Sequence, residues 1–102
     1  MCLVVLAFDC HPRYRVVLAA NRDEFHDRPA APLDWWADAP DILAGRDLAA
    51  GGTWLGVDRH GRLGVVTNFR EPEPAAPAGT SRGTLVPRFL SGEAGALDFA
   101  AR

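Results

Sequence analysis

Residues 1–24 of the chain read MCLVVLAFDCHPRYRVVLAANRDE, and this stretch gives the strongest indication of the fold. Residues 3–8 and 14–20 are two apolar runs rich in valine and leucine, and a polar segment containing Pro12 separates them. Apolar runs of this length, bounded by turn residues, are typical of buried strands. Proline lacks the N–H that a ladder needs, so Pro12 belongs to the connection. The stretch therefore predicts a β-hairpin with Cys2 at the start of its first strand.

The segment that follows, residues 21–50, is polar and is interrupted by three prolines, Pro29, Pro32 and Pro40. Proline fixes one backbone angle and removes a donor, so this composition predicts a long connection that has its own contacts but no long helix or strand. Trp35 and Trp36 would pin the connection to the body of the protein, because an indole left in water forfeits a large burial term. The alternative is that the pair forms a platform on which a ligand stacks.

A second hairpin is expected over residues 53–58 and 63–69, because Gly51 and Gly52 precede its first strand and Gly61 lies in the turn between its two strands. The two hairpins together supply at least four strands. Residues 71–79 carry several prolines and predict an exposed loop.

The last part of the chain has helical patterns. Ser81 would cap a helix that ends at Gly92 and whose apolar face is formed by side chains at helical spacing, Leu85, Val86, Phe89 and Leu90. A further helical pattern over residues 93–102 places on one side Ala94, Leu97 and Ala101. The four strands would form a sheet, and two short helices can cover only one of its two faces. We therefore expect a single domain over residues 1–102 that is truncated at its C-terminus and associates with itself through the uncovered face of its sheet.

Length and composition place the chain among folded globular domains. Its 102 residues are 48% hydrophobic and 24% charged, which argues against disorder. A net charge of -2 from mixed acidic and basic residues leaves no basic stripe for phosphates or anionic lipid, so nucleic acid and membrane surfaces are not expected partners. No apolar run approaches the roughly 20 residues that cross a bilayer, and the opening lacks the features of a secretory signal. With cysteines at positions 2 and 10, a cytoplasmic protein with reduced thiols is predicted.

Cys2 directly follows the initiator methionine, which is readily removed ahead of a small residue. One residue then carries both a thiol and a free α-amine. The amine titrates at about 7.7–8.0 and the thiol at about 8.5, so each can exchange a proton with the other near neutrality. This is the N-terminal form of an activated nucleophile. The alternative is a small buried hydrophobic residue.

Polar residues follow two of the expected strands. Asn21, Arg22, Asp23 and Glu24 come after the second strand, where Arg22 would favour the thiolate of Cys2 and Asp23 would hold its ammonium. The alternative for this segment is a solvated turn. Asn68 ends a later apolar strand and would donate to the oxyanion of a tetrahedral intermediate, an interaction worth about 2.7–4 kcal/mol per donor.

Short motifs occur in order along nearly the whole chain. They are Met1-Cys2, NRDE at 21–24, Arg28-Pro29, AGRD at 44–47, GGTWLG at 51–56, Thr67-Asn68 and SRG at 81–83. Together they resemble the NRDE family, the relatives of the transport and Golgi organisation proteins, which is named for the tetrapeptide at 21–24. Members of that family are substantially longer than this chain.

The NRDE family is in turn similar to the cysteine-type N-terminal-nucleophile hydrolases, which include penicillin V acylase and bile salt hydrolase. This resemblance implies an α+β fold, an αββα sandwich of which the chain would be the N-terminal portion. It implies hydrolysis of a carbon–nitrogen amide bond with Cys2 as nucleophile. Arg22 and Asp23 match in kind, though not in spacing, an arginine and an aspartate of the acylases, and Asn68 matches their oxyanion asparagine. The substrate-binding candidates are Asn21, Glu24, Trp54 and Arg70.

Work on the family points to secretory-pathway organisation, lipid handling and haem movement, which implies an alternative class of function. In that alternative the protein is a non-catalytic carrier that holds haem or an acyl chain in the same cleft. The haem-ligand candidates are His11, His26 and His60, although histidines in loops are usually solvated. Residues 23–27 have no second cluster at zinc-like spacing, so neither a metal site nor a cofactor is predicted. The expected partner is a small amide or an apolar ligand.

Overall fold

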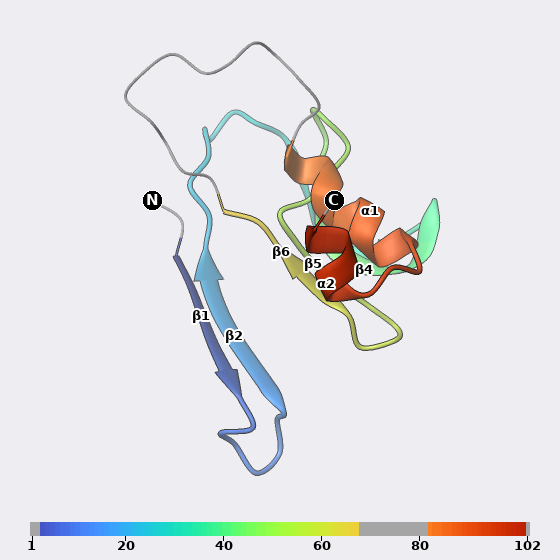
Figure 1. Ribbon diagram of the computed structural model, residues 1–102. Coiled ribbons are helices and arrows are strands. Elements are labelled where there is room, and N and C mark those ends of the chain that lie inside the picture. The colour runs from blue at the N-terminus through green and yellow to red at the C-terminus, as the bar shows by residue number, and fades with distance from the viewer. Residues whose placement is uncertain (1–2, 68–81, 102) are drawn as a thin grey trace. The chain divides into compact units, whose positions relative to one another are not determined.

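The computed structural model describes residues 3–67 and 82–101 (Figure 1). Its elements in chain order are β1 (Leu3–Phe8), β2 (Val16–Asn21), β3 (Ala30–Trp36), β4 (Ala39–Asp47), β5 (Leu55–Asp58), β6 (Leu63–Val65), a 3-10 turn (Arg82–Thr84), α1 (Leu85–Ser91) and α2 (Ala96–Ala100). The chain divides into two compact units, a hairpin unit with β1 and β2 and a sheet unit with β3–β6 and both helices. The described strands pair antiparallel, which confirms the predicted mixture of antiparallel sheet and helix.

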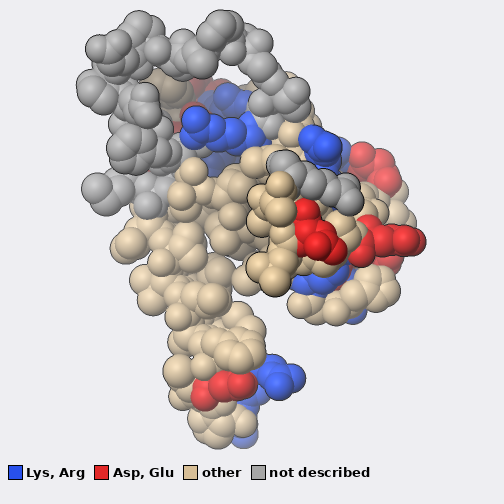
Figure 2. Space-filling view, viewed as in Figure 1, with Lys and Arg blue, Asp and Glu red and all other residues tan. Residues whose placement is uncertain are grey.

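The hairpin of β1 and β2 confirms the prediction made from residues 1–24. Its register runs from Leu3 opposite Asn21 to Phe8 opposite Val16. Asp9 closes the tip with a φ of 55°, and its N–H donates to the Arg15 carbonyl at 2.8 Å. Aspartate is among the residues that enter this left-handed region most readily. Figure 2 shows charged side chains gathered at the tip and an almost uncharged surface along the strands.

The hairpin carries large apolar side chains that stay exposed. Leu3, Val5, Leu6 and Phe8 are each exposed by 55–59%. A two-stranded hairpin in water is marginal by itself. The hairpin unit therefore depends for its stability on a cover for these side chains.

The prediction that residues 21–50 form a long connection is wrong, because β3 and β4 occupy residues 30–47. The prolines are accommodated by irregular pairing. Pro32 lies on the edge strand β3, where the register shifts between Ala31 and Asp34, and Pro40 lies in the second register shift beside the turn. A proline at a bulge or a sheet edge removes no ladder hydrogen bond, so strands tolerate it there.

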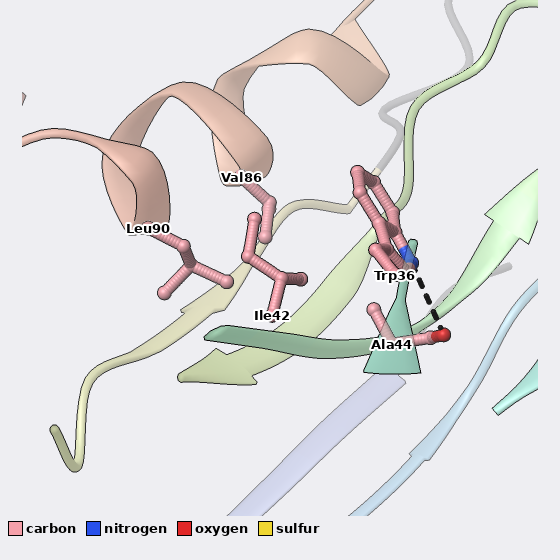
Figure 3. Close-up of a cluster of buried hydrophobic side chains, with 5 residues drawn as sticks. All are labelled: Trp36, Ile42, Ala44, Val86 and Leu90. Atoms are coloured by element: carbon pink, nitrogen blue, oxygen red, sulfur yellow. Dashed lines mark hydrogen bonds between the residues drawn. The ribbon is translucent and has the colours of Figure 1, made fainter. Parts of the chain in front are cut away.

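The sheet has the strand order β3-β4-β5-β6, and α1 packs on one of its faces. Pairing of Leu55 with Val65 and of Val57 with Leu63 confirms the second predicted hairpin, with shorter strands than expected. The buried core consists of Trp36, Ile42, Ala44, Val86 and Leu90 (Figure 3). Alternation along β4 puts its two core residues on one face, and helical spacing puts the two from α1 opposite them.

Two glycines allow α1 to lie close to the sheet. A Cβ on Gly56 would lie 3.1 Å from the Leu90 Cδ1 atom, and one on Gly64 would lie 3.1 Å from the Val86 Cγ1 atom. These distances are tighter than ordinary van der Waals contact. The helix predicted between Ser81 and Gly92 is confirmed over residues 85–91, and residues 82–84 form the 3-10 turn instead. Leu85 on its expected apolar face is 42% exposed. Ser81, its predicted cap, and the predicted loop 71–79 lie outside the described residues.

The predicted apolar side of the last helix is wrong. Leu97 is 87% exposed, and the aromatic contact is made by Phe99, whose ring lies edge-on to Phe89 with centroids 5.3 Å apart. The helix begins at Ala96 and not at residue 93, because the chain from Gly92 to Gly95 is extended at both glycines. This later start changes which side chains turn toward α1.

The sheet face opposite α1 carries a row of apolar side chains. Trp35, Leu43, Val57 and Leu63 are register partners across the four strands. The row is partly open, since Trp35 is 43% exposed and Val57 is 37% exposed. Of the two tryptophans predicted to pin this region, Trp36 is buried and donates from Nε1 to the Ala44 carbonyl at 3.3 Å. Self-association through this face stays a prediction.

Candidate functional site

Asn21 lies where the hairpin opens, at the end of β2. Its Oδ1 accepts a hydrogen bond from the N–H of Leu3 at 2.9 Å, across the strand pair in which the two residues are partners. Leu3 is the residue that follows Cys2 in the sequence. The side chain predicted to bind substrate is therefore engaged with the first described backbone group of β1.

Arg22, Asp23 and Glu24 follow directly and are half-buried. The Arg22 Nη2 atom lies 3.1 Å from the Glu24 Oε2 atom, and the Glu24 Oε1 atom accepts from the N–H of Phe25 at 2.9 Å. The side chains of Arg22 and Glu24 are 29% and 25% exposed. The residues after Asn21 thus form an irregular segment in which the Glu24 carboxylate offsets part of the Arg22 charge.

The remaining predicted site residues fall into two groups. Cys2, Asn68 and Arg70 lie outside the described residues. Trp54 belongs to the sheet unit, where it is half-buried and its carbonyl accepts from the N–H of Val66 at 2.8 Å. Among the described candidates, Arg22 and Glu24 contact each other, and Asn21, which precedes them at the end of β2, contacts Leu3.

Arg28 and Asp47 form a bidentate ion pair that is not predicted by the sequence. Arg28 Nε and Nη2 donate to Asp47 Oδ1 and Oδ2 at 3.1 and 2.6 Å, which is the planar fork geometry of strong arginine–carboxylate pairs. The Asp47 Oδ1 atom also accepts from the N–H of Ala49 at 3.0 Å. The hydrogen bond from Arg28 holds the pKa of the Asp47 carboxyl below its usual range. The sequence feature that points to this pair is the opposite charge of one residue in each of two motifs, at 28–29 and 44–47.

A pH dependence follows from this lowered pKa. A carboxyl that is more acidic in the folded state adds stability above its unfolded pKa, and that stability is lost as the pH falls through the folded pKa. We therefore expect Arg28→Gln to lower the urea midpoint at neutral pH, and the gap from the wild type to shrink steadily below about pH 4. Arg88→Gln, which removes an exposed charge on α1, is the control and should give a small gap. A gap for Arg28→Gln that is constant from pH 7 to pH 3 would contradict the assignment.

Gly52 and Gly83 bring two further motifs into backbone contact. The N–H of Thr53 donates to the Gly83 carbonyl at 3.0 Å, and a Cβ built on Gly52 would lie 2.2 Å from that same oxygen. The Gly52 carbonyl in turn accepts from the N–H of Asp47 at 2.7 Å. The motifs at 28–29, 44–47, 51–56 and the described part of 81–83 are therefore linked to one another by hydrogen bonds.

Arg46 holds the turn between β3 and β4. Its guanidinium stacks on the Trp36 ring, with Cζ 3.9 Å from the ring centroid, and its Nη2 atom donates to Asp38 Oδ2 at 2.9 Å. The Arg46 Nε atom donates to the Gly51 carbonyl at 2.9 Å. The hydrogen bond from Arg46 lowers the pKa of Asp38. These contacts give the AGRD motif a structural role as well.

Arg62 joins the β5–β6 turn to the end of α1. Its two terminal nitrogens donate to three carbonyls at the end of that helix, with N–O distances of 2.5 Å to Phe89, 2.5 Å to Gly92 and 2.9 Å to Ala94. A cation suits this position, because carbonyls without partners give a helix C-terminus a partial negative charge. The Arg62 Nε atom lies 4.0 Å from Asp58 Oδ2, and the Asp58 side chain is 1% exposed.

An apolar groove runs between β6 and the two helices, with a volume of about 570 Å³. It is lined by Leu63, Gly64, Val65, Val66, Leu85, Val86, Phe89, Ala96, Phe99 and Ala100. Its volume is within the usual range for small-molecule sites. The histidines proposed as haem ligands do not line it. In residues 3–67 and 82–101 no group of three or more His, Cys, Asp or Glu side chains is arranged to hold a metal ion.

The antiparallel sheets and short helices define an α+β protein, and no helix of the described residues is long and apolar enough to cross a membrane. The family described as Transport and Golgi organisation 2 matches the chain over residues 1–102. The chain belongs to this family. The resemblance to the NRDE relatives of the transport and Golgi organisation proteins is thereby confirmed.

Individual relatives agree with this assignment. The Transport and Golgi organization 2 homolog of Mus musculus is 42% identical over 106 residues, which cover 97% of this chain and 38% of the relative. The Homo sapiens homolog is 40% identical, with the same coverage of both chains. The Drosophila melanogaster protein is 33% identical over 101 residues, or 89% of this chain and 35% of the relative. The chain therefore spans well under half the length of these relatives.

Proposed function

We propose that the chain supplies the nucleophile-bearing part of a cysteine N-terminal-nucleophile amidohydrolase with an αββα sandwich fold. The reaction would hydrolyse the carbon–nitrogen bond of an amide. The assignment to a cytoplasmic protein is part of the same proposal, and the exposed, free thiol of Cys10 suits a reducing compartment.

One observation carries the proposal, namely the hydrogen bond between Leu3 and Asn21 at the open end of the hairpin. Cys2 is bonded to Leu3, and the NRDE segment begins with Asn21. The polar segment therefore starts at the same end of the hairpin as the proposed nucleophile. Arg22 and Glu24 are ordered there by their ion pair. Arg22 and Glu24 are half-buried just after the end of β2, and an arginine near a thiol would favour its thiolate.

In the proposed mechanism the α-amine of Cys2 takes the thiol proton and the thiolate sulfur attacks the amide carbon. The carbonyl π electrons move to oxygen, and Asn68 donates a hydrogen bond to the oxyanion. The oxyanion collapses, the carbon–nitrogen bond breaks, and the leaving nitrogen takes the proton from the ammonium. Water then attacks the thioester, gives a proton to the amine and releases the carboxylic acid and the thiol. Arg22 would favour the thiolate, with its effect moderated by the Glu24 carboxylate beside it.

Mass spectrometry tests this mechanism on the protein with its processed amino terminus. Met1 should be absent, because the α-amine of Cys2 must be free. A panel of activated acyl amides should leave one acyl group on Cys2, and Cys2→Ala should abolish the adduct. Cys10→Ser is the matched control and should leave the adduct unchanged, because Cys10 lies beyond the far end of β1. Retained Met1, or acylation that survives Cys2→Ala, would refute the nucleophile assignment.

The groove beside β6 favours a second candidate function, a carrier for an apolar chain. An apolar ligand buried there gains about 0.8 kcal/mol per methylene group, and none of the described residues that line the groove has a charged side chain that would lose solvation. Under this alternative the protein would hold a lipid without hydrolysing it. Haem is a less suitable ligand, since the lining has no histidine.

We expect saturable binding of a fluorescent fatty acid that persists in Cys2→Ser. Phe99→Ser should weaken it about tenfold or more, because the ring lines the groove and contacts Phe89. Leu97→Ser on the same short helix is the control and should have little effect, since Leu97 is 87% exposed and does not line the groove. Equal losses in the two variants would rule out the groove as the binding site.

A further inference from the structure

The open end of the hairpin is tied by a side chain. At the tip, the backbone N–H of Asp9 bonds to the Arg15 carbonyl. At the other end, the N–H of Leu3 donates to the Oδ1 atom of Asn21 at 2.9 Å. The first residues of a chain are usually poorly ordered unless they are tied down. The carboxamide of Asn21 is therefore placed where it limits fraying of the first strand.

The restraint reaches beyond Leu3, because the N–H that Asn21 holds is part of the peptide unit joining Cys2 to Leu3. The atoms of a peptide unit are nearly coplanar, and the plane includes the Cα atom of the preceding residue. Orienting the Leu3 N–H therefore orients the plane that contains the Cα atom of Cys2. Once Met1 is removed, the direction of the α-amine depends on ψ of Cys2, and that of the sulfur on ψ and χ1.

We propose that Asn21 is a positioning residue for Cys2 and not a substrate ligand: its carboxamide holds the peptide unit that carries the nucleophile. This inference rests on the proposed function. A neutral acceptor suits the role, because a carboxylate at position 21 would hold the same N–H but would also oppose formation of a thiolate nearby. The residue at position 21 can therefore affect Cys2 in two ways, by holding the Leu3 N–H and by its charge. Substitutions that change only one of these two properties test the proposal.

The experiment compares wild type, Asn21→Leu and Asn21→Asp, all with Cys10→Ser and with Met1 removed. It measures hydrogen exchange of the Leu3 amide and the rate of iodoacetamide modification of Cys2 against pH. Asn21→Leu has similar volume and no acceptor, so Leu3 exchange should accelerate about threefold to tenfold. Its alkylation profile should move toward that of an unperturbed thiol, with a midpoint near about 8.5. Asn21→Asp keeps the acceptor, so Leu3 should stay protected while the alkylation profile moves to higher pH.

His11→Leu is the matched control. The His11 Nδ1 atom accepts from the N–H of Arg13 at 3.1 Å, so this variant also removes a side-chain acceptor for a backbone N–H of the hairpin. The loss occurs at the tip, about 17 Å along the strand from Leu3. Exchange at the tip should accelerate, while Leu3 protection and the Cys2 profile should match those of wild type.

The outcomes separate this inference from the proposed function. Unchanged Leu3 exchange in Asn21→Leu, or superimposable Cys2 profiles in all three proteins, would overturn the positioning role. So would a variant whose only defect is a raised KM for an amide, since that is the behaviour of a substrate ligand. If the predicted changes occur but no acyl adduct ever forms on Cys2, the positioning role stands and the hydrolase proposal fails.

Discussion

Gly52→Ala should lower the free energy of unfolding of the sheet unit by about 3 kcal/mol, at the upper end of the usual cost of overpacking. A Cβ at this position would lie 2.2 Å from the Gly83 carbonyl oxygen and 2.5 Å from its carbonyl carbon. The obstacle is backbone, so no rotamer change relieves it. The backbone shift that does relieve it would stretch the hydrogen bond between the Thr53 N–H and that oxygen. Urea denaturation followed by tryptophan fluorescence measures the loss, because Trp36 is in the core of this unit.

Gly95→Ala is the control for the change from glycine to alanine. Its φ is -67°, which alanine adopts freely, and a Cβ there would meet no heavy atom within 4 Å. The expected change is within about 0.5 kcal/mol. If Gly52→Ala is no more destabilising than Gly95→Ala, the close approach of residues 52 and 83 is not a feature of the folded protein.

Arg62→Met should destabilise the same unit by about 3–5 kcal/mol. The change removes donors to three carbonyls at and just beyond the end of α1, and it also removes the cation that lies 4.0 Å from Asp58, whose side chain is 1% exposed. Asp58 Oδ2 has no hydrogen-bond partner among the described residues and lies 4.0 Å from Arg62 Nε, whereas Asp58 Oδ1 accepts from the N–H groups of His60 and Arg62. Denaturant unfolding and helical circular dichroism report the two consequences, lower stability and fraying of α1.

Arg59→Met removes an arginine from the same turn and serves as the comparison. Arg59 is 53% exposed and lies 3.4 Å from Asp41, which is 61% exposed, so the pair should be worth less than about 1 kcal/mol. Adding Asp58→Asn to Arg62→Met should recover part of the loss, because it removes the buried charge that was left without a partner. Equal effects of the two arginine variants would show that Arg62 is an ordinary surface residue.

The fold could be predicted from the sequence wherever pattern and turn chemistry agree. Residues 3–8 and the apolar run before Asn21 read as strands, and Val86 and Leu90 have helical spacing on one face, as observed. The strands β3 and β4 were missed because Pro32 and Pro40 suggest irregular structure. The strands tolerate these prolines because of bulges and an edge position, and both are properties of the assembled sheet that the local sequence does not reveal.

The sequence predicts where the candidate site lies in the hairpin, but not which side chains contact each other there. The order of the hairpin strands indicates that residues 21–24 begin at the end where Cys2 is attached, and the register agrees with this for Leu3 and Asn21. The ion pair of Arg22 with Glu24 could not be predicted, because the side chains of a four-residue polar run have several possible partners. The pair of Arg28 with Asp47 requires the strand pairing that brings residues nineteen positions apart into contact.

The contact between Thr53 and Gly83 also has a consequence for synthesis on the ribosome. Strands β3 to β6 leave the exit tunnel before residue 83 and before the helix that carries Val86 and Leu90. At translation rates of about 5–20 residues per second, the nascent sheet would wait on the order of seconds for its helical cover. During that interval the side chain of Ile42, which is 1% exposed in the folded unit, would lack its core neighbours Val86 and Leu90. A synonymous codon change that slows translation between residues 66 and 85 would lengthen this exposure without altering a single amino acid.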